Sequence, residues 1–207
     1  MKIAFLGDSF CFDTGPDTWP RLVADHLNGE IVSKGKSGGN EWETLSTFKN
    51  IVDTKLAVDL FIFCHTDPYR LPNRHNEPFS AIGCEKNKNI NEIWNAGNLY
   101  YEHLMSFEYH EFMYILMLDE CQRILEKLNT PYLHLFSFDP DVSGYKTYKW
   151  NKHLPNSETR CLSKISYQAN PTHRSTGYLP NHMNHAGNKL VSKMVLDKLK
   201  TLWNITQ

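Results

Sequence analysis

The sequence lacks several features that would assign a protein class directly. No apolar stretch in its 207 residues approaches the length of ~18 residues that a membrane-spanning helix needs. The net charge of -1 gives no global basic field of the kind that attracts nucleic acid or anionic membranes. The five cysteines are scattered without a C-x-x-C pair, which argues against a disulfide framework or a zinc site. We therefore expect no nucleic acid, no membrane, no metal and no other cofactor.

The first residues carry no export signal that we can identify. The apolar run Ile3–Leu6 is too short for the core of a signal peptide, and no small-residue cleavage site follows it. With unpaired cysteines, this favours a cytoplasmic protein. The chain also has no internal repeat, low-complexity tract or Pro/Gly/Ser linker. A single domain spanning residues 1–207 is the simplest organisation.

Short apolar runs alternate with segments of helical periodicity, which is typical of β-α-β units and a parallel sheet. We expect strands at 2–6, 30–33, 59–64 and 132–137. We expect helices at 18–27, 41–52, 90–128 with a break near Ser106, and 186–203. Residues 70–89 and 138–180 are polar or irregular and are predicted to be loops. The pattern places the protein in the α/β class.

Polar clusters follow the first three expected strands and precede the last helix. In a parallel α/β sheet, ligands bind outside the carboxyl ends of the strands, so the fold would gather these clusters on one rim. The clusters are Gly7-Asp8-Ser9, Ser37-Gly38-Gly39-Asn40, His65-Thr66-Asp67 and Asn181-His182-Met183-Asn184-His185.

Together the clusters contain what acyl transfer requires. A serine hydroxyl such as that of Ser9 needs a base, and His182 or His185 supplies one near neutral pH. The tetrahedral intermediate needs N–H donors, which the backbone of Ser9 and Gly38 could provide.

The ordered set of motifs resembles the SGNH/GDSL family of serine hydrolases. Gly7-Asp8-Ser9-Phe10 is similar to the family's first block, and Gly35-x-Ser37-Gly38 to its second. Asp59-Leu60-x-Ile62 and His65-Thr66-Asp67 resemble the strand and turn of the third block. His182-x-Asn184-x-x-Gly187 is similar to the last block. The resemblance implies a flavodoxin-like, three-layer α/β/α sandwich with a mainly parallel sheet, Ser9 as nucleophile, His182 as base and Gly38 in the oxyanion hole.

Two positions depart from the family pattern. Asp67 stands where the third block has an asparagine that donates to the oxyanion, and an ionised carboxylate cannot donate. Leu179 stands where the family has the aspartate that orients the histidine. Ser9 and His182 could act as a dyad, or Asp139 or Asp141 could orient the imidazole. The G-x-S-x-G elbow of the other large serine esterase class is absent.

Other readings of these residues remain open. Asp67 is also a typical turn and N-cap residue before Pro68, and Asp8 either orients the site or stabilises its own turn. His185 either supports the site or forms a metal-binding pair with His182, although no third ligand is near in sequence. Arg70 lies in a polar loop and is interpreted as a solvated residue that could bind an anionic or sugar substrate.

We therefore expect a serine esterase acting on a small acyl ester, such as an O-acetyl group on a carbohydrate. The alternative is a catalytically degenerate binding or structural module of the same fold, and an acyltransferase is a third reading. A homo-oligomer or a larger assembly is left open.

Overall fold

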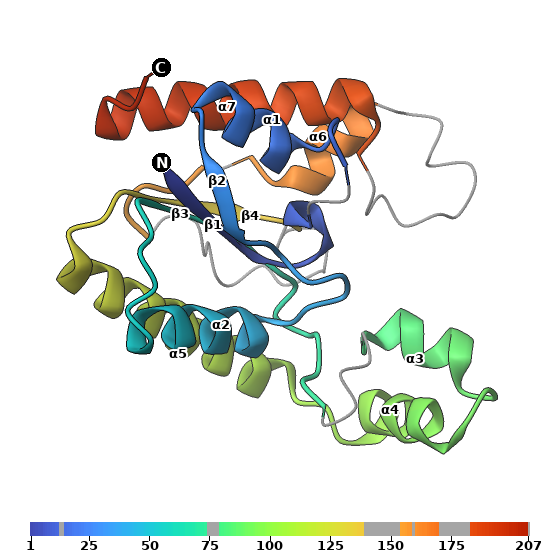
Figure 1. The fold of residues 1–207 in the computed structure, drawn as a ribbon. Helices are drawn as coiled ribbons and strands as arrows, with labels where there is room; N and C mark the ends of the chain where they lie inside the picture. Colours follow the sequence, from blue (N-terminus) through green and yellow to red (C-terminus); the bar gives the residue numbers. More distant parts are fainter. Residues whose placement is uncertain (13–14, 74–78, 139–153, 159, 170–182, 207) are drawn as a thin grey trace.

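A parallel four-stranded sheet forms the centre of the protein (Figure 1). The computed structural model describes residues 1–12, 15–73, 79–138, 154–158, 160–169 and 183–206. The strands are β1 (Lys2–Gly7), β2 (Glu30–Ser33), β3 (Leu60–His65) and β4 (Tyr132–Phe136), in the order β2-β1-β3-β4. Every neighbouring pair is parallel. This is the α/β class predicted from the sequence, and the strand order matches the flavodoxin-like pattern.

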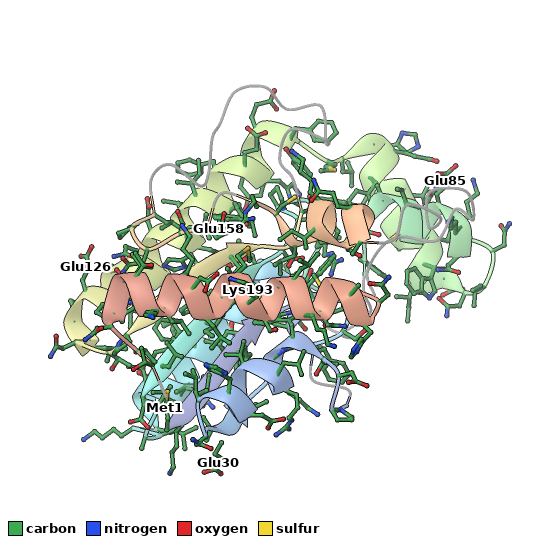
Figure 2. All side chains as sticks on the ribbon, turned by 90° about the horizontal axis from the view of Figure 1, so that it is seen from above. Met1, Glu30, Glu85, Glu126, Glu158 and Lys193 are labelled. Atoms are coloured by element: carbon green, nitrogen blue, oxygen red, sulfur yellow. The ribbon has the colours of Figure 1, made fainter. Side chains whose placement is uncertain are left out.

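Helices cover both faces of the sheet and complete three layers (Figure 1). On one face lie α1 (Trp19–His26), α6 (Leu162–Ala169) and α7 (His185–Trp203); on the other lie α2 (Glu41–Asp53) and α5 (Phe107–Leu128). Figure 2 views the molecule from the first side, with α7 lying across the sheet and Lys193 on it. The remaining pair, α3 (Ala81–Asn87) and α4 (Glu92–His103), packs together beyond the sheet, with Glu85 at that end of the molecule in Figure 2.

Alternate residues of each strand pack into two separate cores, because successive side chains of a strand point to opposite faces of the sheet. Toward α1 and α7 the strands contribute Ile3, Phe5, Ile62, Cys64, Leu133 and Leu135. Toward α2 and α5 they contribute Ala4, Leu6, Phe61, Phe63 and Tyr132. All six residues of β3 are buried, which explains why its sequence is almost continuously apolar.

The predicted elements agree with the structure except in the two segments expected to be loops. The helical region 90–128 is broken where expected, because Ser106 caps α5 by accepting a hydrogen bond from Tyr109 N. The prediction of an irregular 70–89 was wrong over α3, whose N-cap is Ser80. The prediction of an irregular 138–180 was wrong over α6. Both helices are short, so each shows too few turns for a clear period.

One edge of the sheet is partly covered by a later segment of the chain. Beside β4, His134 N donates to Asn156 O at 3.0 Å, and Glu158 N donates to His134 O at 2.9 Å. Ser157 thereby forms an isolated parallel bridge with His134. Within the described part of the chain, no helix is long and apolar enough to cross a membrane.

Candidate functional site

The carboxyl ends of the four strands meet at one end of the sheet, where the predicted polar clusters follow them (Figure 1). The chain after β1 enters a short 3-10 helix, η1 (Ser9–Cys11). Helices α2 and α7 both begin at this same end. The topology therefore gathers segments that are far apart in sequence on one rim.

Ser9 is the first residue of η1. Its hydroxyl oxygen is buried, and it has no hydrogen-bond partner among the described residues. A buried hydroxyl without a partner is costly, and such a group in a native structure calls for an explanation. As the first residue of a helix, Ser9 also has a backbone N–H without a partner inside that helix.

Asp8, just before Ser9, is fully buried and holds three rim segments together. Its Oδ1 accepts hydrogen bonds from Phe10 N at 3.0 Å and from Ser137 Oγ at 2.8 Å. Its Oδ2 accepts from Thr66 Oγ1 at 3.0 Å. Burial raises the pKa of Asp8, while the nearby Arg70 charge and these hydrogen bonds oppose the rise. Asp8 thus both stabilises its own turn and links the ends of β1, β3 and β4.

The loop after β2 brings Gly38 to the rim in a left-handed conformation, with φ of +71°. Gly35 lies close against the chain after β1, because a Cβ there would be 2.4 Å from Asp8 O. The loop is tied down by Gly35 N donating to Cys11 O and Lys36 N donating to Gly7 O. Asn40 then caps α2 in a capping box with Glu43. The second block is therefore held directly beside the first.

Asp67, in the turn after β3, accepts a hydrogen bond within its own turn and is not arranged as a donor to an oxyanion. Its Oδ1 accepts a hydrogen bond from Tyr69 N at 2.9 Å, as the turn interpretation of this residue expects. Burial raises the pKa of Asp67, and the hydrogen bond from Tyr69 N and the charge of Arg70 oppose the rise.

A buried polar chain that sequence reasoning missed runs behind the rim. His65 Nδ1 contacts Glu41 Oε1 at 2.8 Å, and His65 Nε2 contacts His134 Nδ1 at 2.8 Å. Glu41 Oε2 also accepts from Thr66 N at 3.2 Å. Both histidines are fully buried, and Glu41 is 3% exposed. The signal was present, since each histidine sits in an otherwise apolar strand and a buried polar side chain needs a partner.

The hydrogen-bond partners of His134 determine which of its ring nitrogens carries the proton. Gln122 Nε2 donates to Glu126 and to Tyr132, so Gln122 Oε1, 3.4 Å from His134 Nε2, acts as the acceptor. His134 therefore carries its proton on Nε2 and accepts at Nδ1 from His65. Burial, followed by the charge of His65, lowers the pKa of His134 well below its ordinary value. His134 is thus a neutral histidine.

The start of α7 returns to the rim. Trp19 N donates to Asn188 Oδ1 at 2.8 Å, and Trp19 Nε1 donates to Phe10 O at 2.5 Å. Met183 packs against the core that contains Phe10. His182 itself lies outside the described residues, as do Leu179, Asp139 and Asp141. His185 is exposed, with Nδ1 3.4 Å from Asp17 Oδ1.

Arg70 does not have the solvated loop position expected from the sequence. Its side chain is only 10% exposed and contacts several rim segments. The expectation failed because the loop from 70 onward is polar in composition, while its first residue packs inward.

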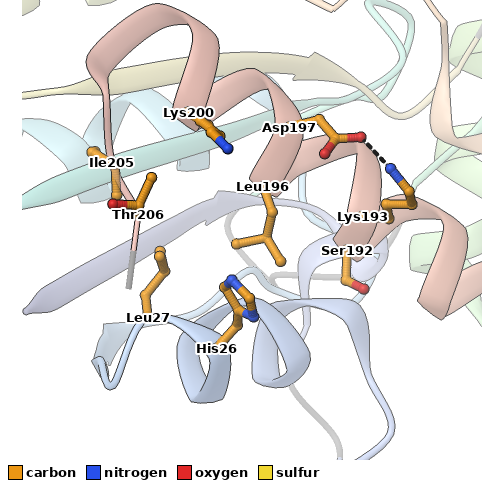
Figure 3. Close-up of a pocket in the computed structure, with 9 residues that line it drawn as sticks. All are labelled: His26, Leu27, Ser192, Lys193, Leu196, Asp197, Lys200, Ile205 and Thr206. Carbon is orange, nitrogen blue, oxygen red and sulfur yellow. Dashed lines mark hydrogen bonds and ion pairs between the residues drawn. The ribbon is translucent and has the colours of Figure 1, made fainter.

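A pocket of about 420 Å³ lies between the end of α1, the middle and second half of α7, and the chain that follows α7 (Figure 3). Leu196 and His26 face it from opposite sides, and Lys193 is paired with Asp197. None of the predicted site residues lines this pocket. It is therefore separate from the rim.

Comparisons with known proteins support the fold. No family model and no curated protein matches the chain. The chain is similar to the crystal structure of LAE5, an alpha/beta hydrolase enzyme from the metagenome of Lake Arreo, Spain. The TM-score is 0.54 at 15% identity, over 97% of this chain and 95% of that chain. A lipolytic protein of the G-D-S-L family from Desulfitobacterium hafniense DCB-2 aligns over 76% of this chain and 91% of that chain at 14% identity, with a TM-score of 0.30, a value that shows no common fold. The chain thus has a fold also found in a hydrolase.

Proposed function

We propose that the protein is a serine hydrolase of the SGNH type that cleaves a small acyl ester, such as an O-acetyl group on a carbohydrate. The observation that carries the proposal is Ser9 Oγ, a buried hydroxyl without a partner among the described residues. It stands at a strand-to-helix junction on the rim where this class of fold binds ligands. The same fold occurs in LAE5, an alpha/beta hydrolase enzyme, which supports the proposal at the level of the fold.

In the proposed reaction, Ser9 Oγ attacks the acyl carbonyl while His182 accepts the hydroxyl proton. The backbone N–H groups of Ser9 and Gly38 stabilise the oxyanion, and the left-handed φ of Gly38 supports its role. His182 then returns the proton to the leaving alcohol, and water hydrolyses the acyl-enzyme by the same route. The choice of His182 rests on its place in the last motif and on Met183, the next residue, packing against the core that contains Phe10.

The experiment compares hydrolysis of p-nitrophenyl acetate and an acetylated sugar by wild type, Ser9→Ala and His182→Ala. Ser37→Ala is the matched control for the serine, because Ser37 is exposed in the neighbouring loop. His185→Ala tests the other candidate base. We expect activity to fall to background in the first two variants and to persist in the other two. Labelling with a fluorophosphonate should modify Ser9 in the wild type.

A wild type with no activity on several acyl lengths and no labelling of Ser9 would overturn the proposal. It would favour the second candidate, a degenerate binding module, which Asp67 and Leu179 at the family's asparagine and aspartate positions already motivate. Loss of activity in His185→Ala instead of His182→Ala would retain a serine hydrolase but reassign the base.

A further inference from the structure

Arg70 touches the segments that follow all the other strands. Its own turn is fixed, because Arg70 N donates to Asp67 O at 3.2 Å across Pro68. Tyr101 OH, from α4, donates to Tyr69 O at 2.7 Å and holds the turn from outside. The side chain is thereby directed into the rim, where it is 10% exposed.

Three contacts define what we call the Arg70 clamp. Arg70 Nη1 donates to Gly39 O at 3.0 Å, after β2. The same nitrogen lies 3.7 Å from Asp8 Oδ2, after β1. The guanidinium carbon lies 5.1 Å from the ring centroid of Phe138, after β4. A planar guanidinium can bond and stack at once, which a lysine ammonium cannot do in the same way.

The contact with Gly39 bears on the loop that carries Gly38. Gly39 N donates to Lys36 O at 2.9 Å, within the loop. Gly39 O accepts from Arg70, so both backbone groups of Gly39 are hydrogen-bonded. Gly38 directly precedes this fixed residue. The Gly38–Gly39 segment is therefore restrained at Gly39, two peptide planes after the Gly38 N–H.

We propose that Arg70 is a positioning residue that fixes the Gly38–Gly39 segment for oxyanion binding. This proposal rests on the proposed function. Arg70 acts through Gly39 and not by contact with the substrate, so its loss should lower kcat and leave KM nearly unchanged. A misplacement of about 1 Å in such a group can cost about 10²-fold in rate, which is the size of effect expected for Arg70→Gln.

The test uses Arg70→Gln, Arg70→Lys and the control Arg123→Gln, whose side chain is 55% exposed and paired with Glu120. Two readouts are combined: ester hydrolysis with kcat and KM separated, and amide hydrogen exchange of a peptide covering residues 34–40. We expect faster exchange in that peptide and a lower kcat for both Arg70 variants, with exchange in α7 unchanged. Arg70→Lys retains the charge beside Asp8, so it should keep the wild-type Tm while still losing kcat.

Several outcomes would overturn the proposal: unchanged kcat in Arg70→Gln, a change confined to KM, or full activity in Arg70→Lys. Exchange that rises equally in residues 34–40 and in α7 would show a general loss of stability instead. If the wild type has no esterase activity, the proposed function fails by itself. The exchange of residues 34–40 in the variants then still decides whether Arg70 holds the loop.

Discussion

Acidification should destabilise the protein through His134. Burial keeps this histidine neutral in the folded state, and the charge of His65 acts in the same direction. Its Nδ1 already accepts from His65, and its Nε2 proton faces Gln122. Its pKa is well below the ordinary value in the folded state and returns to about 6.5 on unfolding. Below about pH 6.5 the unfolded chain therefore binds more protons than the folded protein, so the free energy of unfolding falls as the pH falls.

The size of this loss in the free energy of unfolding follows if His134 binds a proton only in the unfolded state. Between pH 7.5 and pH 5.5 the loss is on the order of 1 kcal/mol, or a few °C in Tm for a chain of this size. Burial also lowers the pKa of His110, which adds a loss of the same sign. The raised pKa of Asp8 has the opposite sign, because above about pH 3.8 the folded protein holds this proton more readily than the unfolded chain.

The assay is urea unfolding at pH 7.5 and 5.5 for wild type, His134→Gln and the control His103→Gln, whose side chain is 67% exposed. His134→Gln should be less stable at both pH values, but its loss of stability between them should be smaller than that of the wild type by on the order of 1 kcal/mol. His103→Gln should keep the wild-type difference. Equal losses in wild type and His134→Gln would refute the neutral assignment of His134.

Two further predictions concern the rim and the core. Gly35→Ala should lower the Tm measured by differential scanning fluorimetry, because the new Cβ would lie 2.4 Å from both Asp8 O and Cys11 Sγ; an unchanged Tm would mean that this loop moves freely. Leu133→Ala should cost about 2–5 kcal/mol in urea unfolding, because Leu133 is fully buried in the core between the sheet and α7. A cost below about 1 kcal/mol would show that the core on the α7 side is loosely packed.

The strands could be predicted from the sequence because their apolar runs are short, dense and separated by polar turns. The predicted strand at 30–33 coincides with β2, and that at 59–64 is shifted by one residue from β3. The rim was also predictable, since the carboxyl ends of parallel strands meet at one edge. Ser9, Gly38 and Asp67 follow their strands as expected.

The connections within the rim could not be predicted, because they join residues without a shared sequence period. Glu41 looks like an ordinary acidic residue in the first turn of a helix, yet it contacts His65 from 24 residues away. His134 is 69 residues from His65. Arg70 looks like a loop residue until Gly39 and Phe138 are placed beside it. Such contacts depend on tertiary packing, which local patterns do not record.

The bridge at Ser157 has a consequence for aggregation. An open strand edge presents unpaired N–H and C=O groups on which a strand of another molecule can pair. At β4 both backbone groups of His134 are already used by Asn156 and Glu158. β2, at the other edge, has only four residues and offers a short template. Both borders of the sheet are thus poor sites for edge-to-edge pairing, so growth of a continuous sheet between copies of the folded chain is disfavoured.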